Sequence, residues 1–360
     1  MKKIAILFGG RSEEHEISVL SAASVVGAID RAKYEPVPIG INRAGDWFLI
    51  GEGCLRGVRE RDDPRIGTLI PAGRGPISQT PLNPGCLSDL ADFAFPVLHG
   101  PYGEDGRLQG LLEMLDMPYG GCGVAASAIA MDKVFTKEIW IRAGLPVCRH
   151  TVLRRRAYEA DPAGERARIE RALGYPVFVK PSGLGSSVGV GKARDAGALA
   201  RVIEEAFSHD DRLIIEEAVD GRELEIGVLG NATPLVSAVG EIVPNAEFYD
   251  YDAKYRSGAA KLFIPADIPA ETAARVSALA QEAYSVLNAE GFARVDFFLD
   301  RKSGAVLLNE INTIPGFTAY SMFPMLWRAA GVAYGDLIER IIGLGYERHH
   351  AENHRKPNNA

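Results

Sequence analysis

The segment from Lys180 to Lys192, which reads KPSGLGSSVGVGK, carries the clearest chemical signal in the sequence. Glycines let a backbone approach an anion closely and turn its N–H groups toward it. Ser186 and Ser187 add hydroxyl donors, and Lys180 ends an apolar run, where a lysine without a function is unusual. The segment matches neither the Walker A pattern nor G-x-G-x-x-G, so its composition favours phosphate binding and a plain turn about equally.

Acidic and amide side chains share faces on two strands that the sequence predicts near its C-terminal end. The period of two places Arg294 and Asp296 on one face of the first strand. It does the same for Glu310 and Asn312 on the second. These oxygen donors suit Mg²⁺. The alternative is ordinary polar positions on half-exposed strands, which is commoner for one strand than for two neighbours with bulky apolar residues beside each acid.

A glycine pair, Gly9 and Gly10, ends the first apolar run and opens a predicted helix that carries Glu16. In doubly wound folds such a turn is a site for anions or polar ligands. The alternative for Glu16 is an acid favoured by the positive end of the helix dipole. His99 also stands where an apolar run ends, whereas His15 is predicted to lie at the surface.

Two further polar segments could contribute to a site. Residues 249–255 are too polar for a core strand, and the stretch 245–258 around them is where an active-site lid is expected. The alternative is a solvated loop with exposed tyrosines. The segment 312–321, NTIPGFTAYS, leaves a predicted strand and offers N–H and hydroxyl groups to an anion.

Strands and helices alternate in the first third of the chain. Apolar runs typical of buried strands cover 4–8, 37–41 and 93–98, with helices predicted from Glu16 to Ile29 and around Leu108, Leu111, Leu112 and Leu115. This alternation predicts a parallel sheet with helices on its faces. Residues 51–88, rich in Gly and Pro, are predicted to form an irregular excursion or short edge strands without chemistry.

The rest of the chain is predicted to hold a central unit and a third, α+β unit. The central unit has predicted helices over 132–143, 163–173 and 195–207, and strands near Val152 and over 176–180 and 213–217. The third has predicted strands over 223–230, 234–243, 292–300 and 305–312, and a helix over 271–290. From Arg348 onward the chain is polar and without periodicity, so its end is predicted to be frayed.

The chain has 360 residues, enough for two or three domains. Apolar residues make up 47% and charged residues 24%, which excludes wholesale disorder and is typical of a soluble enzyme. The net charge of −7 argues weakly against a nucleic-acid partner. Without a signal sequence or a membrane-spanning apolar run, the expected location is the cytoplasm, with no membrane partner. The cysteines form no CxxC pair and are expected to be free thiols: Cys54, Cys86, Cys122 and Cys148.

Taken together, these segments resemble the D-alanine–D-alanine ligases, a family of the ATP-grasp superfamily. The resemblance extends from Phe8 to about Pro324. Its motifs are FGGRSEEHEIS from Phe8, HGPYGEDG from His99, MDK from Met131, KPSGLGSSVG from Lys180, FYDYDAKY from Phe248, RVD from Arg294 and NEINTIPG from Asn309. Any one of them could arise by chance, but all of them in this order make the resemblance specific.

The resemblance implies a fold of α/β and α+β type, with the three-domain ATP-grasp architecture and an N-terminal parallel-sheet domain. Residues 1–122 would form the N-terminal substrate domain and 123–220 the central ATP-grasp subdomain. Residues 221–347 would form the C-terminal ATP-grasp domain with its lid near 245–258, and 348–360 a flexible tail.

The resemblance also implies roles for individual residues. ATP is expected between the central and C-terminal domains, bound by Lys133, Lys180, Ser186, Ser187, Glu216, Glu217, Val219, Glu223, Phe248, Lys254, Phe298, Asn309 and Glu310. Two Mg²⁺ or Mn²⁺ ions are expected at Asp296, Glu310 and Asn312.

The substrate residues follow from the same resemblance. The first D-alanine is expected near Glu16, His99 and Arg294, and the carboxylate of the second at Ser321. Arg294 and the N–H of Gly316 are expected to hold the oxyanion of the tetrahedral intermediate. Glu16, Ser186 and Tyr255 are expected to form a hydrogen-bonded trio that joins the N-terminal domain, the glycine loop and the lid.

The implied reaction is ATP-dependent ligation of two D-alanines through D-alanyl phosphate, for peptidoglycan precursor synthesis. A ligase that makes D-alanyl-D-lactate or D-alanyl-D-serine is an alternative, and the retained pair Lys254 and Tyr255 favours a D-alanine amine as nucleophile. A catalytically inactive ATP-binding regulator is a second alternative, disfavoured by the complete set of site residues. A homodimer is expected by analogy with the family.

Overall fold

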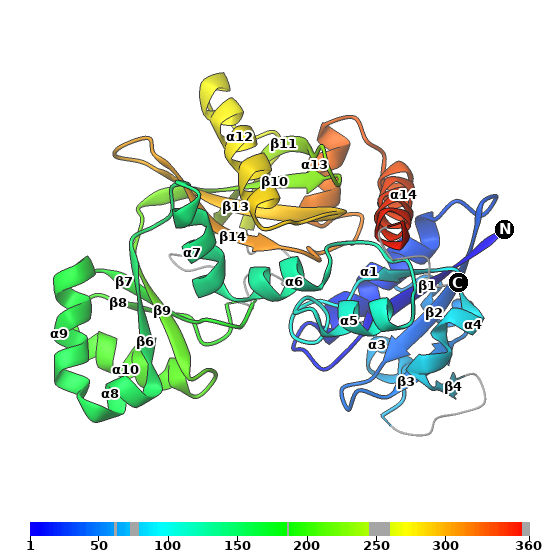
Figure 1. The fold of residues 1–360 in the computed structure, drawn as a ribbon, viewed down its shortest axis with the longest axis horizontal. Coiled ribbons are helices and arrows are strands. Elements are labelled where there is room, and N and C mark those ends of the chain that lie inside the picture. Colours follow the sequence, from blue (N-terminus) through cyan, green and yellow to red (C-terminus); the bar gives the residue numbers. More distant parts are fainter. Residues whose placement is uncertain (61–62, 73–78, 186, 245–259, 355–360) are drawn as a thin grey trace.

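The computed structural model describes residues 1–60, 63–72, 79–185, 187–244 and 260–354, which form three sheets with helices around them (Figure 1). In Figure 1 the N-terminal sheet lies at the lower right, the central sheet at the lower left and the C-terminal sheet above them. The expected mixture of α/β and α+β architecture is confirmed. Within these described ranges, no helix is long and apolar enough to cross a membrane.

The N-terminal sheet has a parallel centre because its first strands are buried on both faces. Its order is β4-β3-β2-β1-β5; β1 pairs in parallel with β2 and β5, whereas β3 and β4 are antiparallel additions at one edge. The strands are β1 (Lys2–Gly9), β2 (Tyr34–Ile41), β3 (Trp47–Ile50), β4 (Gln79–Leu82) and β5 (Phe93–Pro96). Helix α1 (His15–Ala28) packs on one face and α5 (Arg107–Met114) on the other.

Residues 51–88 contain one edge strand, β4, and several short helical turns. These are α2 (Glu52–Leu55), α3 (Ile66–Leu69), η1 (Pro84–Cys86) and α4 (Leu87–Leu90). Leu55, Ile66 and Leu69 are buried in the same core cluster as α1. The described part of this excursion therefore closes one side of the N-terminal core.

The central sheet is antiparallel, with the order β6-β9-β7-β8. Its strands are β6 (His150–Arg154), β7 (Val177–Pro181), β8 (Gly191–Ala193) and β9 (Arg212–Glu217). Helices α8 (Arg155–Ala160), α9 (Pro162–Leu173) and α10 (Ala196–Phe207) accompany it. Before it come α6 (Val124–Met131) and α7 (Lys133–Arg142), and Trp140 of α7 anchors that helix to the C-terminal core by donating to the Ala283 carbonyl at 3.0 Å.

The C-terminal sheet is also antiparallel, with the order β12-β11-β10-β13-β14. Its strands are β10 (Gly221–Leu229), β11 (Leu235–Pro244), β12 (Ala260–Phe263), β13 (Phe292–Asp300) and β14 (Val306–Asn312). Helix α12 (Ala270–Val286) ends earlier than the predicted 290, and Asn288 and Gly291 follow it with positive φ. Helix α13 (Met322–Ala329) contacts β10 and β11, and α14 (Tyr334–Asn353) follows it.

Helix α14 continues past the point at which the sequence predicted a frayed end. It runs to Asn353, and Arg348 is buried. The Arg348 guanidinium donates to the carbonyls of Gly121 and Tyr119 and lies 4.0 Å from the centre of the Tyr119 ring. Figure 1 shows α14, in red, between the N-terminal and C-terminal sheets. The expected tail is therefore ordered as far as His354, and 355–360 lie outside the described residues.

Replacement of Arg348 by methionine is expected to lower the free energy of unfolding by about 2–4 kcal/mol, because two carbonyls of buried residues lose their donor. Urea unfolding of the whole chain measures this change. Arg340→Met, on an exposed position of the same helix, is the control and is expected to change stability by less than about 0.5 kcal/mol. Equal stability of the two variants would contradict the anchoring role of Arg348.

All four cysteines are free thiols, as the sequence predicted. Cys122 and Cys148 are buried, and burial raises the pKa of Cys122 to about 12 and that of Cys148 to about 11. These two thiols therefore stay protonated at neutral pH.

Candidate active site

A cavity of about 690 Å³ lies between the central and C-terminal sheets. β7 and β9 contribute one side, and β10, β13 and β14 the other. The predicted residues that line it are Lys133, Lys180, Ser187, Glu216, Glu217, Val219, Glu223, Asp296, Phe298, Asn309 and Glu310. Four other predicted site residues, Ser186, Phe248, Lys254 and Tyr255, lie outside the described residues, as does the predicted lid at 245–258.

The start of helix α7 positions Lys133 at the edge of this cavity. Asp132 caps the helix by accepting hydrogen bonds from the N–H groups of Val134 and Phe135, and Ser182 donates to it at 2.8 Å. The Lys133 ammonium donates to the Leu184 carbonyl at 2.7 Å. The cap therefore ties the lysine to the glycine-rich loop.

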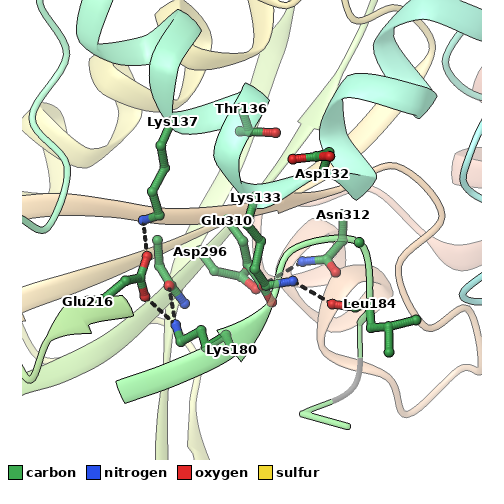
Figure 2. Close-up of polar contacts among 12 residues, drawn as sticks. Asp132, Lys133, Thr136, Lys137, Lys180, Leu184, Glu216, Asp296, Glu310 and Asn312 are labelled. Carbon is green, nitrogen blue, oxygen red and sulfur yellow. Dashed lines mark hydrogen bonds and ion pairs between the residues drawn. The ribbon is translucent and has the colours of Figure 1, made fainter. Parts of the chain in front are cut away.

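Lysines and carboxylates lie in contact with one another at the wall of the cavity (Figure 2). The Lys180 ammonium lies 2.5 Å from Glu216 Oε2, and Lys137 lies 2.9 Å from Glu216 Oε1. Lys133 lies 3.5 Å from Glu310 Oε2. Although burial alone would raise the pKa of Glu216, Lys137 and Lys180 hold it well below its usual value. Burial alone would lower the pKa of Lys180, but Glu216 and Glu310 raise it. Glu216 and Lys180 are therefore both charged at neutral pH.

Strand register brings the predicted acidic and amide groups together. Asp296 of β13 is paired with Glu310 of β14, and Arg294 with Asn312, so the four side chains meet at one end of the sheet. The Arg294 guanidinium donates two hydrogen bonds of 2.7 Å to Asp296, and Asn312 donates to the same carboxylate at 3.0 Å. The predicted shared face of Arg294 and Asp296 is confirmed by this contact.

Glu225 of β10 is a site residue that sequence reasoning missed. It stands opposite Asp296 in the sheet, and its Oε2 lies 3.0 Å from Arg294 Nε. Burial alone would lower the pKa of Arg294, but the carboxylates of Asp296 and Glu225 hold it well above its usual value. Alternation along the strand placed Glu225 on the same face as Glu223, a signal that was available in the sequence.

A second cavity, of about 270 Å³, adjoins the first and reaches the N-terminal domain. Glu225 and Gly185 line both cavities. The predicted residues His99, Arg294, Asn312, Gly316 and Ser321 line the second one, together with Glu14 and Glu104. The two cavities therefore meet at Glu225, the carboxylate that pairs with Arg294.

His99 is buried near the start of the loop that follows β5 and is held by two contacts. Its Nδ1 lies 2.9 Å from the Ile314 carbonyl oxygen, and its Nε2 lies 3.1 Å from Ser21 Oγ. Glu104 Oε1 lies 3.8 Å from His99 Nδ1. Burial raises the pKa of Glu104, and Glu104 and Glu14 raise that of His99 although burial alone would lower it.

The structure brings Glu14 to the second cavity, and it does not bring Glu16 there. Glu16 Oε1 lies 2.7 Å from Arg43 Nη2, an ion pair outside the lining of the cavity. Although partial burial would raise the pKa of Glu16, Arg43 lowers it. Helix α1 begins at His15, and two residues along a helix differ by about 200° in direction. The sequence did not fix this start, so it could not show which of the two nearby acids lines the cavity, and the role of Glu16 at the first D-alanine stays a prediction.

His15 is a correction in the same motif. The sequence predicted a surface residue, but the side chain is buried, and its Nδ1 lies 2.8 Å from the Gly10 carbonyl oxygen. Ser18 accepts from the N–H of Gly9 and donates to the Val97 carbonyl. These contacts fix the glycine turn that precedes α1.

Among the residues that the structure describes, no group of three or more His, Cys, Asp or Glu side chains is arranged to hold a metal ion. The predicted set has two acids and one amide, and both oxygens of Asp296 accept from Arg294. Two carboxylates and an amide oxygen are a donor set that fits Mg²⁺ when phosphates supply the remaining ligands.

Two antiparallel sheets that enclose a cavity lined by lysines and carboxylates, beside a parallel-sheet domain, define an ATP-grasp enzyme. Two solved structures share this fold. The VanG D-Ala:D-Ser ligase from Enterococcus faecalis aligns with a TM-score of 0.82 and 35% identity, over 96% of this chain and 99% of that one. The D-alanine–D-alanine ligase from Coxiella burnetii aligns with a TM-score of 0.80 and 34% identity, over 98% of each chain.

Sequence comparison gives the family. The family model for the D-ala D-ala ligase N-terminus matches residues 3–122, and that for the D-ala D-ala ligase C-terminus matches 139–343. The D-alanine–D-alanine ligase of Geobacillus kaustophilus is 47% identical over 353 residues, which cover 96% of this chain and 95% of the relative. That of Chloroherpeton thalassium is 44% identical over 364 residues, 99% of each. The chain belongs to the D-alanine–D-alanine ligase family and is an ATP-dependent ligase.

Proposed function

We propose that the protein joins two D-alanine molecules, with cleavage of ATP to ADP and phosphate, to make D-alanyl-D-alanine for peptidoglycan precursors. The observation that carries the proposal is the junction of the two cavities at Glu225, the partner of Arg294. The larger cavity has the size and the cationic groups for a nucleoside triphosphate, and the smaller one offers acids and a guanidinium to a small zwitterion.

ATP would lie with its triphosphate toward Lys133 and Lys180. The adenine would lie against the end of β9 and the segment that follows it, at Glu216, Glu217 and Val219. The ribose hydroxyls would bind Glu223. Asp296, Glu310 and Asn312 would hold two Mg²⁺ or Mn²⁺ ions. These ions would neutralise phosphate charge when bound.

The first D-alanine would place its ammonium at Glu14 and its carboxylate toward Arg294. That carboxylate attacks the γ-phosphorus, a new C–O–P linkage forms, and ADP leaves. The amine of the second D-alanine, oriented through its own carboxylate at Ser321, then attacks the acyl carbon and loses a proton as inorganic phosphate leaves. Arg294 and the N–H of Gly316 would donate to the oxyanion between these events.

Glu14→Gln is expected to raise the D-alanine concentration for half-maximal ADP release by at least about tenfold, because the ammonium loses a charged acceptor. Glu16→Gln is the matched control. Its carboxylate pairs with Arg43 and is partly exposed, so a change below about twofold is expected. Steady-state kinetics at saturating ATP measure both variants. A larger effect of Glu16→Gln than of Glu14→Gln would restore Glu16 as the substrate ligand.

D-serine is a second candidate for the acceptor, favoured by the similarity to the VanG ligase. The retained pair Lys254 and Tyr255 supports D-alanine instead. Equal concentrations of D-alanine, D-serine and D-lactate, supplied together with ATP at neutral pH, would compete for one acyl phosphate. Mass spectrometry is expected to find mainly D-alanyl-D-alanine. Mainly D-alanyl-D-serine or the D-lactate ester would overturn the acceptor assignment.

ADP release tests the proposal against an inactive ATP-binding regulator. Release is expected to require D-alanine and to be accompanied by the dipeptide. Release that does not respond to D-alanine would reject the ligase assignment.

A cytoplasmic location and a homodimer remain predictions. Sedimentation of the purified chain tests whether it is a homodimer.

A further inference from the structure

Lys137 is a buried cation that the proposed reaction has not used. It lies one helical turn after Lys133 on α7, and its side chain is only 1% exposed. Its ammonium lies 2.9 Å from Glu216 Oε1 and 3.5 Å from the Leu308 carbonyl oxygen. Figure 2 shows it pointing at Glu216 from the side opposite to Lys180.

The Glu216 carboxylate is shared by two ammonium groups. One oxygen faces Lys137 and the other faces Lys180 at 2.5 Å. The Glu216 side chain is 2% exposed, so the carboxylate depends on protein charges rather than on water. The neighbouring ion pair of Lys133 with Glu310 extends this cluster. Its ion pairs then join three ammonium groups to two carboxylates.

We propose that Lys137 is a positioning residue that compensates the charge of Glu216 and so leaves the charge of Lys180 available to the nucleotide phosphates. With only Lys180 beside it, Glu216 would form a closed ion pair with that lysine. Moving Lys180 toward a phosphate would then strip a buried carboxylate of its partner, which is costly. With Lys137 in place, Lys180 can turn to the phosphate while Glu216 keeps a counter-ion. This inference rests on the proposed nucleotide site.

A purely structural role for Lys137 has a different consequence. If Lys137 only filled space between α7 and β14, its removal would disturb the cavity as a whole, and all ligands would bind less well. If Lys137 compensates the charge of Glu216, its removal weakens the binding of ATP and ADP, because their phosphates depend on the charge of Lys180. Adenosine has no phosphate, so its affinity is expected to stay the same.

The test measures binding of ATP, ADP and adenosine by calorimetry to the whole chain and to Lys137→Met, which keeps the length of the side chain without its charge. ATP and ADP are expected to bind about ten- to hundredfold more weakly, the range for loss of a charge-assisted contact, and adenosine within about twofold. Lys33→Met, at an exposed lysine of the N-terminal domain, is the control and is expected to bind as the unaltered chain does.

A double-mutant cycle with Glu216→Gln makes the test sharper. Once residue 216 carries no charge, it needs no counter-ion, and Lys180 is available to the phosphates with or without Lys137. Lys137→Met in the Glu216→Gln background is therefore expected to change ADP affinity by less than about threefold. The double variant can still be measured if Lys137→Met alone folds poorly, because it has no buried Glu216 carboxylate that lacks a counter-ion.

The outcomes separate the inference from the proposed function. Unchanged ATP and ADP affinity in Lys137→Met, or equal losses for ADP and adenosine, would overturn the inference while leaving the ligase intact. The same loss with and without the Glu216 charge would overturn it too. An unaltered chain that does not bind ATP would reject the proposed function and this inference together.

Discussion

Arg294→Ala is expected to abolish ligation while ATP still binds. The guanidinium lines the smaller cavity beside Glu225, which lines both cavities, and it is the cation that the first carboxylate and the later oxyanion would share. Loss of a single oxyanion donor lowers kcat by about 10²–10³-fold, and Arg294 would serve both events, so at least that loss is expected. ADP release measures turnover, and calorimetry measures ATP binding.

Two controls separate this effect from damage to the fold. Arg301→Ala removes a mostly exposed arginine that lines the nucleotide cavity, and nearly full turnover is expected. Arg294→Lys keeps a charge for Asp296 and Glu225 but cannot donate in the two-pronged geometry. It is expected to fold as the unaltered chain does and to remain slow. Turnover of Arg294→Ala at the unaltered rate would refute the oxyanion role.

Glu310→Gln is expected to produce the second large loss, because one proposed metal ligand loses its charge. Glu310 is a cleaner target than Asp296, since Asp296 also pairs with Arg294. Turnover is expected to fall more than about a hundredfold at fixed Mg²⁺, since metal neutralisation of phosphate charge contributes several kcal/mol.

Titration with Mn²⁺, followed by paramagnetic resonance in the presence of ADP, gives a readout independent of turnover. The affinity for Mn²⁺ is expected to fall at least about tenfold in Glu310→Gln. Glu282→Gln, at an exposed position of α12, is the control and is expected to bind Mn²⁺ normally. Unchanged Mn²⁺ binding in Glu310→Gln would remove Glu310 from the metal site.

The features that the sequence predicted correctly are those set by local periodicity. Alternation along one strand placed Arg294 and Asp296 on one face, and the register with β14 then brought Glu310 beside them. The parallel pairing of β1 with β2 and β5 followed from continuous apolar runs in the same way.

The features that the sequence missed depend on partners far along the chain. Glu14 and Glu16 are two residues apart, and only the start of α1, fixed by the turn at Gly9, decides which one faces the cavity. Arg348 looked like part of a polar tail until the carbonyls of Tyr119 and Gly121 gave it partners. Lys137 was not singled out in the sequence, because its partner Glu216 lies far along the chain, on β9.

The central claim is that the D-alanine carboxylate itself receives the γ-phosphate. D-alanine labelled with ¹⁸O in its carboxylate tests this claim most directly, with the released phosphate analysed by mass spectrometry. Because the oxygen that attacks phosphorus leaves with the phosphate, the account predicts one ¹⁸O in each inorganic phosphate formed together with D-alanyl-D-alanine. Phosphate without ¹⁸O would contradict it.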